Sequence, residues 1–251
     1  MAPSPSSTLA DAYDSAFKYL FLNRRNEYVF KNQIVSKIVF GRHSPRTASA
    51  LLELHMGKSI ADVVVINGTT TAYEIKTDLD DFSRLSSQLV DYTRHTEHAF
   101  VVVSDKRAHL AEQQIPDSVG LYSLRPNGAL SLLRPSASHL DRFSTDNLFK
   151  LLRTSEAADL LHRVNGYEPD VPSGHLWLRM RELFKRLSIE TVHKEVLVQL
   201  KKRNSNATKL VSPLEFPRSL RALAYSTELS RVGVERVHER LSTRASELLV
   251  S

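Results

Sequence analysis

Apolar and polar positions along the first forty residues follow the spacing of α-helices. One apolar stripe begins after Thr8, a residue type that caps helices, and contains Tyr13, Phe17, Leu20 and Phe21. A second stripe contains Phe30, Ile34 and Ile38. The pattern therefore predicts one helix from Thr8 and a second over residues 27–40, ending at Gly41.

The pattern then changes to segments typical of β-strands. Residues 50–56, 60–66 and 71–76 are apolar or β-branched, and Gly57 and the pair Asn67-Gly68 separate them. Asn-Gly between two apolar runs favours a hairpin. Farther along, the sequence predicts an amphipathic helix over residues 81–95, and strands over 99–104 and 121–124. These elements predict an α/β sandwich in which helices flank a mixed sheet.

After Asn127-Gly128 the strand pattern fades, and residues 140–251 show mainly helical periodicity. Breakers at Pro126, Gly128 and Pro135 interrupt the periodicity between the two parts. We therefore expect two domains, an α/β domain over residues 1–130 and a helical, basic domain over residues 140–251.

Charge is distributed unevenly between the halves of the chain. Its 251 residues carry a net charge of +6, yet residues 1–125 hold 14 basic and 14 acidic side chains, so the excess is C-terminal. It gathers around Lys194, Lys201, Lys202, Arg203, Lys209, Arg218 and Arg221. Two interpretations stay open, a nucleic-acid contact surface such as a helix-turn-helix variant, or an ordinary solvated helix face.

The composition excludes several classes of protein. Without cysteine there is no disulfide framework and no thiolate zinc site, and the first residues lack the pattern of a secretory signal. No apolar run is long enough to predict a membrane span. The histidines lack the spacing of a zinc site, and no glycine-rich phosphate loop or Gly-x-Ser-x-Gly elbow is present. We expect a cytoplasmic protein.

The hairpin carries the residues with the clearest chemistry. Asp62 lies on its first strand, and Glu74 and Lys76 lie two residues apart on the next, so these last two share a face. Carboxylates of this kind can hold Mg²⁺ or Mn²⁺ against a phosphodiester, while a lysine orients the attacking water. The alternative is that Glu-x-Lys is only a solvated strand face.

The length of the hairpin loop decides whether Asp62 joins the other two. A two-residue loop would pair residue 62 with residue 73, whereas a three-residue loop pairs it with residue 74. The metal-site hypothesis therefore predicts an odd-numbered loop with a glycine bulge.

The helix that follows adds Arg84, Gln88 and Tyr92 on one face. This trio either contacts the backbone of a nucleic acid or braces the catalytic face; alternatively, Gln88 and Tyr92 only border the core. The acidic residues before the helix are expected to cap it rather than to bind metal; they are Asp78, Asp80 and Asp81.

Together, Asp62, Glu74-x-Lys76 and Gln88-x-x-x-Tyr92 resemble the PD-(D/E)xK nuclease superfamily, in particular its RecB-like branch with a Gln-x-x-x-Tyr helix. Small, uncharacterised bacterial proteins of that superfamily carry similar runs. The resemblance covers about residues 20–105. Ala61 stands where the proline of the motif is expected.

The resemblance implies a restriction-endonuclease-like fold and a function for each motif residue. Asp62 and Glu74 would ligate the metal and Lys76 would be the catalytic lysine, while Glu27 or Glu53 would complete the metal site. Arg84, Gln88 and Tyr92 would bind substrate.

The expected activity is that of a Mg²⁺- or Mn²⁺-dependent nuclease, a phosphodiesterase acting on DNA more readily than on RNA. The rival hypothesis is an inactive nuclease-fold protein that binds nucleic acid or a protein partner, for example in a defence or toxin–antitoxin system. A homodimer is compatible with either hypothesis.

Overall fold

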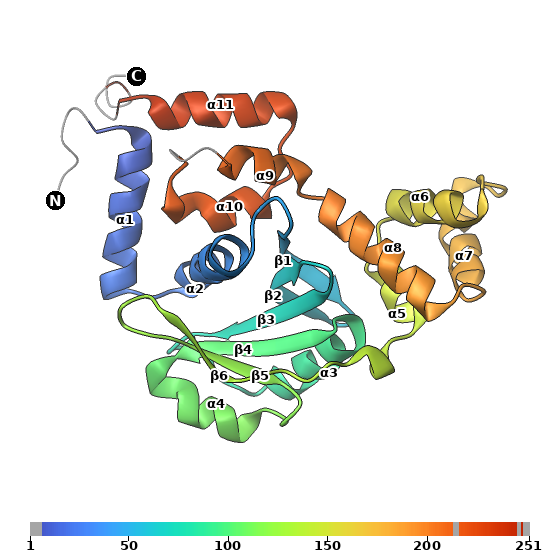
Figure 1. Cartoon of the computed structure of the whole chain (residues 1–251), viewed down its shortest axis with the longest axis horizontal. Helices are drawn as coiled ribbons and strands as arrows, with labels where there is room; N and C mark the ends of the chain where they lie inside the picture. Colours follow the sequence, from blue (N-terminus) through green and yellow to red (C-terminus); the bar gives the residue numbers. More distant parts are fainter. Residues whose placement is uncertain (1–6, 213–215, 245–246, 248–251) are drawn as a thin grey trace.

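A six-stranded mixed sheet forms the centre of the computed structural model, which describes residues 7–212, 216–244 and 247 (Figure 1). Its strands, in spatial and sequence order, are β1 (Ser49–Met56), β2 (Ser59–Ile66), β3 (Thr70–Lys76), β4 (His98–Ser104), β5 (Gly120–Leu124) and β6 (Leu130–Arg134). Strands β3, β4 and β5 run parallel, and the remaining neighbours pair antiparallel. The helices flanking this sheet and the helical C-terminal region confirm the predicted fold class.

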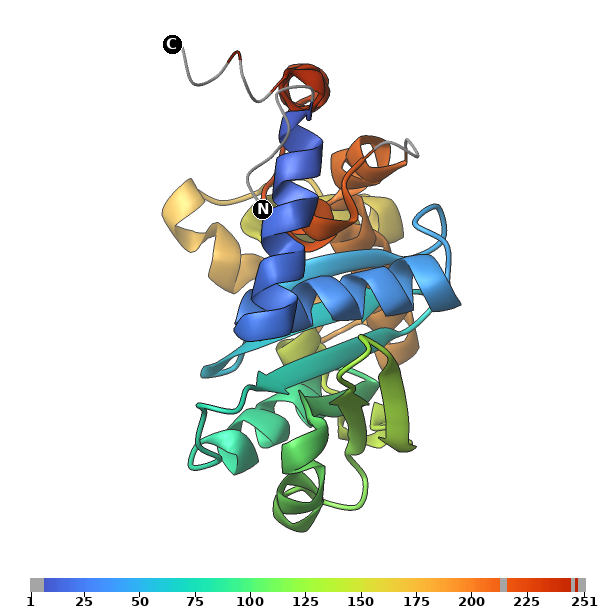
Figure 2. The same ribbon diagram turned by 90° about the vertical axis from the view of Figure 1, so that its left-hand side faces the viewer.

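Helices cover both faces of the sheet and make up most of the C-terminal region (Figures 1 and 2). They are α1 (Leu9–Asn23), α2 (Glu27–Ile34), α3 (Leu85–His95), α4 (Ala108–Gln114), α5 (Thr145–Lys150), α6 (Thr154–Asn165), α7 (Ser173–Phe184), α8 (Ile189–Lys202), α9 (Ser205–Val211), α10 (Arg221–Ser226) and α11 (Arg231–Ser242). Within the described part of the chain, none of them is long and apolar enough to cross a membrane.

The loop between β2 and β3 has three residues, as predicted. Ile66 pairs with Thr70, so residues 67–69 form the connection, and Gly68 adopts a φ of +73° that favours glycine. Register along the two strands therefore places residue 62 opposite residue 74. The hairpin confirms the geometry on which the predicted metal site depends.

The first hydrophobic core lies between the sheet and α3, and continues into the lobe formed by α5–α8 (Figure 1). Leu85, Leu89 and Tyr92 of α3 pack there against alternate residues of β2–β4. Trp177 of α7 packs on Phe149 of α5, with ring centroids 4.2 Å apart, and is partly buried at the edge of this core.

The second core lies on the opposite face, where α2 and the helices α9–α11 cover the sheet. Val63, Val65, Tyr73 and Ile75 contribute the sheet side of this core. Residues on both sides of the expected domain boundary near 126–140 therefore share each core. The C-terminal helices complete the packing of the sheet as well as extending beyond it.

Several local predictions were wrong or incomplete. The pattern did not predict β6 or α4, because β6 is a short edge strand whose residues are all partly exposed and α4 has only seven residues. The helix expected over 81–95 begins at Leu85, since Asp80 and Asp81 hydrogen-bond within the preceding loop instead of capping it. Helix α2 continues as a π-helix over Val35–Arg42.

Arg203, one of the basic residues considered for nucleic-acid contact, forms hydrogen bonds within the fold instead. Its guanidinium donates to Glu156 Oε1 at 2.6 Å and Oε2 at 2.5 Å, and to the carbonyl of Leu151 at 2.6 Å. Only 9% of the arginine side chain and 13% of the glutamate side chain are exposed. This bidentate pair fastens the end of α8 to the start of α6.

Replacing Arg203 with alanine should lower the free energy of unfolding by about 3 kcal/mol, because Glu156 would remain buried without its partner. Lys202→Ala is the matched control, since its ion pair with Asp159 is about half exposed and should contribute under about 1 kcal/mol. Urea denaturation followed by circular dichroism measures both. Equal, small losses would contradict a structural function for Arg203.

Candidate active site

The candidate site forms where β2 separates from β3. These strands pair from Ile66 and Thr70 as far as Val63 and Tyr73, whereas the β1–β2 hairpin remains paired to its far end at Met56 and Ser59. The hairpin therefore bends away from the rest of the sheet. A cleft of about 1240 Å³ opens between the bent hairpin, α3 and the start of α2.

An unusual backbone conformation at Glu53 accompanies the bend. This residue has a φ of +56°, which is rare for a side chain other than glycine and costs about 1–3 kcal/mol. Leu51 and Leu54, three residues apart, face the same core, so β1 changes its buried face at Glu53. Strained backbone thus lies beside the cleft.

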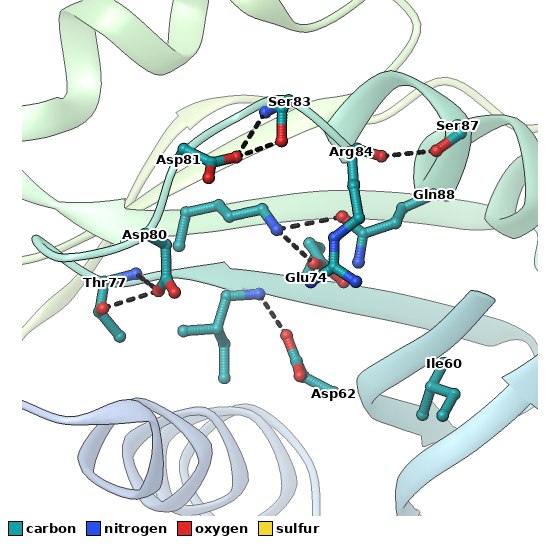
Figure 3. Close-up of polar contacts among 12 residues, drawn as sticks. Ile60, Asp62, Glu74, Thr77, Asp80, Asp81, Ser83, Arg84, Ser87 and Gln88 are labelled. Atoms are coloured by element: carbon teal, nitrogen blue, oxygen red, sulfur yellow. Dashed lines mark hydrogen bonds and ion pairs between the residues drawn. The ribbon is translucent and has the colours of Figure 1, made fainter.

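Asp62 occupies the point of separation and lines the cleft. Its carboxylate oxygen Oδ2 accepts a hydrogen bond of 2.7 Å from the backbone N–H of Ile75 (Figure 3). The side chain thereby satisfies a donor on β3 where β2 has moved away. This contact fixes Asp62 next to Glu74.

Glu74 and Lys76 form a buried ion pair on the same face of β3. Lys76 Nζ lies 2.9 Å from Glu74 Oε1, and the two residues are 7% and 2% exposed. The ammonium also donates to the amide oxygen of Gln88 on α3 at 3.0 Å. This excludes the alternative that Glu-x-Lys is a solvated strand face.

Tyr92 is the α3 residue that contacts the carboxylate of Glu74. Its hydroxyl donates to Glu74 Oε2 at 2.5 Å and lies 2.8 Å from the carbonyl oxygen of Ile60. Burial and the charge of Glu74 raise the pKa of Tyr92 well above its usual value, so the hydroxyl stays protonated as a donor. Because Tyr92 is 0% exposed, its ring braces Glu74 and does not face substrate.

The other two predicted ligands, Glu27 and Glu53, line the same cleft but contact a lysine that the sequence did not single out as functional. Lys31 Nζ lies 2.5 Å from Glu27 Oε1 and 3.1 Å from Glu53 Oε1. Although burial lowers it, hydrogen bonds to both carboxylates raise the pKa of Lys31 overall. The four-residue spacing of Glu27 and Lys31 indicates the first of these ion pairs, whereas no local pattern indicates the second, with Glu53.

The burial of the Asp62 carboxylate is poorly compensated by hydrogen bonds and opposite charges. Burial, and then the nearby charge of Glu74, raise the pKa of Asp62 to about 7, although the N–H of Ile75 acts in the opposite direction. The ionised form of Asp62 is therefore destabilised when no cation is bound. A cation between Asp62 and Glu74 would relieve this repulsion.

The donor set fits a hard divalent cation that takes few protein ligands. Within the described ranges, no three acidic or histidine side chains are arranged as a ready metal cluster. Mg²⁺, however, commonly uses one or two carboxylates and completes its shell with water and substrate oxygens. Asp62 and Glu74 meet that requirement, whereas Glu27 and Glu53, the two candidates expected to complete the site, both pair with Lys31.

Basic side chains form the rim of the cleft. Arg84 extends beside Glu74 and Gln88 (Figure 3), and Lys58 and Arg94 are exposed farther along the same lining. Helix α5, the first helix of the C-terminal region, contributes Asn147 and Lys150. No sequence pattern indicated that α5 would reach this cleft.

Asp91 of α3 holds the end of the β1–β2 hairpin against the rim. Its Oδ2 accepts from the backbone N–H of Lys58 at 3.1 Å and from the hydroxyl of Ser59 at 2.7 Å. Gly57 has a φ of +61°, and a Cβ there would lie 2.5 Å from Asp91 Oδ1. The close approach requires glycine at this turn.

Comparison with known proteins gives two matches. A family model described as "Bacteriophage P4 protein cII" matches residues 22–221, a range that contains every residue of the cleft named above. A solved structure, the SPO1766 protein of unknown function from Silicibacter pomeroyi, is 15% identical, with 50% of this chain and 87% of that chain covered and a TM-score of 0.33. No curated protein gives a significant match.

Replacing Asp62 with asparagine should stabilise the metal-free protein above pH 7. A carboxyl whose pKa is about 7 in the fold and 3.8 when unfolded destabilises the fold when ionised, and this penalty disappears as the pH falls toward 3.8. In EDTA at pH 8 we expect a melting temperature higher by about 3–6 °C, with little change at pH 4. Asp141→Asn, at an exposed site, is the control. An equal shift at both pH values would contradict the assignment.

Proposed function

This chain belongs to the bacteriophage P4 protein cII family, and we propose that it is a metal-dependent nuclease with a PD-(D/E)xK-type site. The observation that carries the proposal is the meeting of Asp62, Glu74 and Lys76 at the base of one cleft, where Gln88 and Tyr92 hold the last two in place. Structural needs alone do not explain a buried Glu–Lys pair beside an undercompensated aspartate.

Asp62 and Glu74 would hold the metal ion, Mg²⁺ or Mn²⁺. When bound, the ion would neutralise charge that develops on phosphorus and lower the pKa of a coordinated water. Tyr92 keeps Glu74 oriented by donating to Oε2, which leaves the carboxylate little freedom to rotate. Such preorganisation is what a metal site on a rigid strand requires.

Lys76 would act on the attacking water. An ammonium has three N–H groups, and Glu74 and Gln88 accept two of those of Lys76. The third can be directed at a water or at a phosphate oxygen in the cleft. Lys76 would thereby orient the nucleophile and stabilise the negative charge of the transition state.

The rim favours a polymeric substrate over a small phosphate compound. Arg84, which precedes the first residue of α3, and Arg94 near its end lie ten residues apart, which corresponds to about 15 Å along the helix. Ser87 and Asp91 lie between them on the same lining. A strand of nucleic acid could follow this face, with its phosphates near the two arginines. DNA is the first candidate, in keeping with the resemblance, and the cytoplasm is the expected place of action.

A second candidate is a nucleic-acid-binding module that has the scaffold without activity, acting alone or with a protein partner. The observation that favours it is that Lys31 pairs with Glu27 and Glu53, and that no group of three or more acidic or histidine side chains among the described residues is arranged to hold a metal ion. Binding without cleavage would distinguish this candidate.

The proposal predicts cleavage that depends on both metal and the named residues. Labelled single- and double-stranded DNA and RNA should be tested with Mg²⁺, Mn²⁺ or EDTA. We expect metal-dependent cutting that falls at least about 100-fold in Asp62→Asn and Lys76→Met, since each removes a group that acts in the transition state. Lys37→Met, on an exposed lysine outside the cleft, should cut normally. Cutting that survives in both site variants, or no cutting by the folded wild type on any substrate, would contradict the proposal.

The rim can be tested without catalysis by measuring binding in Ca²⁺ with fluorescence anisotropy. Arg94→Ala should weaken binding a few-fold and reduce the slope of log K against log salt by about 1, because one phosphate contact is lost. Arg186→Ala, an exposed arginine outside the cleft, should leave the slope unchanged. The same slope for wild type and Arg94→Ala would argue against this path.

A further inference from the structure

Lys31 is placed unusually for a partner of acidic side chains. It is 6% exposed, whereas the side chains of its partners, Glu27 and Glu53, are 55% and 72% exposed. The two carboxylates come from different elements, the start of α2 and the distorted point of β1. A buried ammonium therefore joins two carboxylates that open toward the cleft, which differs from an ordinary surface pair.

The strained backbone of Glu53 supports a specific function for this arrangement. A φ of +56° at a non-glycine residue persists only where the surroundings hold it, and such residues gather at functional sites. In this conformation the carboxylate of Glu53, on β1, accepts a hydrogen bond from Lys31 of helix α2. The strained residue is therefore the one that supplies the second carboxylate to the lysine.

The two lysines of the cleft divide its carboxylates into two groups. Lys31 pairs with Glu27 and Glu53, and Lys76 pairs with Glu74, next to Asp62. Without Lys31, Glu27 and Glu53 would lose their shared partner, and two further carboxylates would be open to metal.

We infer that Lys31 restricts this site to a single divalent metal ion by keeping Glu27 and Glu53 as its own ion-pair partners. The inference rests on the proposed metal site at Asp62 and Glu74, and goes beyond it by assigning a function to Lys31. Lys31 is a positioning residue, since it acts through the two carboxylates that it holds. Two-metal nucleolytic sites need carboxylates that reach both ions. Glu27 and Glu53 are the candidates to bind a second ion, and their ion pairs with Lys31 prevent it.

Replacement of Lys31 with methionine tests this directly. The variant removes the charge and retains an unbranched side chain that can fill the buried space. Mn²⁺ binding, measured by electron paramagnetic resonance and isothermal titration calorimetry without nucleic acid, should give one ion for wild type and two for Lys31→Met. Lys37→Met is the control and should bind one ion.

A second variant keeps the test decisive if Lys31→Met does not fold. Replacing both Glu27 and Glu53 with glutamine while keeping Lys31 should leave one bound Mn²⁺, with the affinity reduced less than about tenfold, because these side chains are not ligands. Loss of binding in that variant would overturn the inference.

The remaining outcomes separate the two proposals. Two ions bound by wild type, or one ion bound by a folded Lys31→Met protein, would overturn the inference and leave the metal site intact. No Mn²⁺ bound by wild type would overturn the proposed metal site together with the inference that rests on it.

Discussion

Burial of charge is the constraint around which this cleft is built. A charged side chain away from water is costly unless it is paired and hydrogen-bonded, and Glu74, Lys76 and Lys31 are all largely buried. Helix α3 supplies the required partners for the first two through Gln88 and Tyr92. The site therefore depends on the packing of α3 against the sheet. A shift of that helix would leave a buried carboxylate and a buried ammonium partly unsatisfied.

Asp62 is the exception to this compensation, and the exception is informative. One backbone N–H offsets only part of the effect of burial, and the adjacent Glu74 adds repulsion, so the pKa of Asp62 is raised to about 7. Groups that are undercompensated in this way are frequent at functional sites, where binding supplies the missing partner. The asymmetry between a fully paired Glu74 and a poorly paired Asp62 indicates where a cation would act.

The C-terminal helices take part in both the fold and the cleft. They complete the two cores that cover the sheet, and α5 brings Asn147 and Lys150 to the rim. The match to the family model spans the sheet and most of these helices. The two expected parts of the chain are therefore joined at the site as well as in the cores.

Local chemistry in the sequence predicted much of the hairpin, because side chains alternate along strands and loop length sets the register. The shared face of Glu74 and Lys76 followed from strand alternation alone, whereas the odd-numbered loop was predicted by requiring Asp62 to share that face. Other features depend on contacts distant in sequence: the pairing of Lys31 with Glu53, the docking of Asp91 at Gly57, and the approach of α5. No local pattern encodes such contacts. The strand β6 was missed since five partly exposed residues have little periodicity.

The most direct test of the central claim is anomalous diffraction from crystals of the protein grown with Mn²⁺. We predict one strong peak within coordination distance of the carboxylates of Asp62 and Glu74, with Glu27 and Glu53 still contacting Lys31. A map at saturating Mn²⁺ without a peak at Asp62 and Glu74 would contradict the assignment of this cleft as a metal-dependent active site.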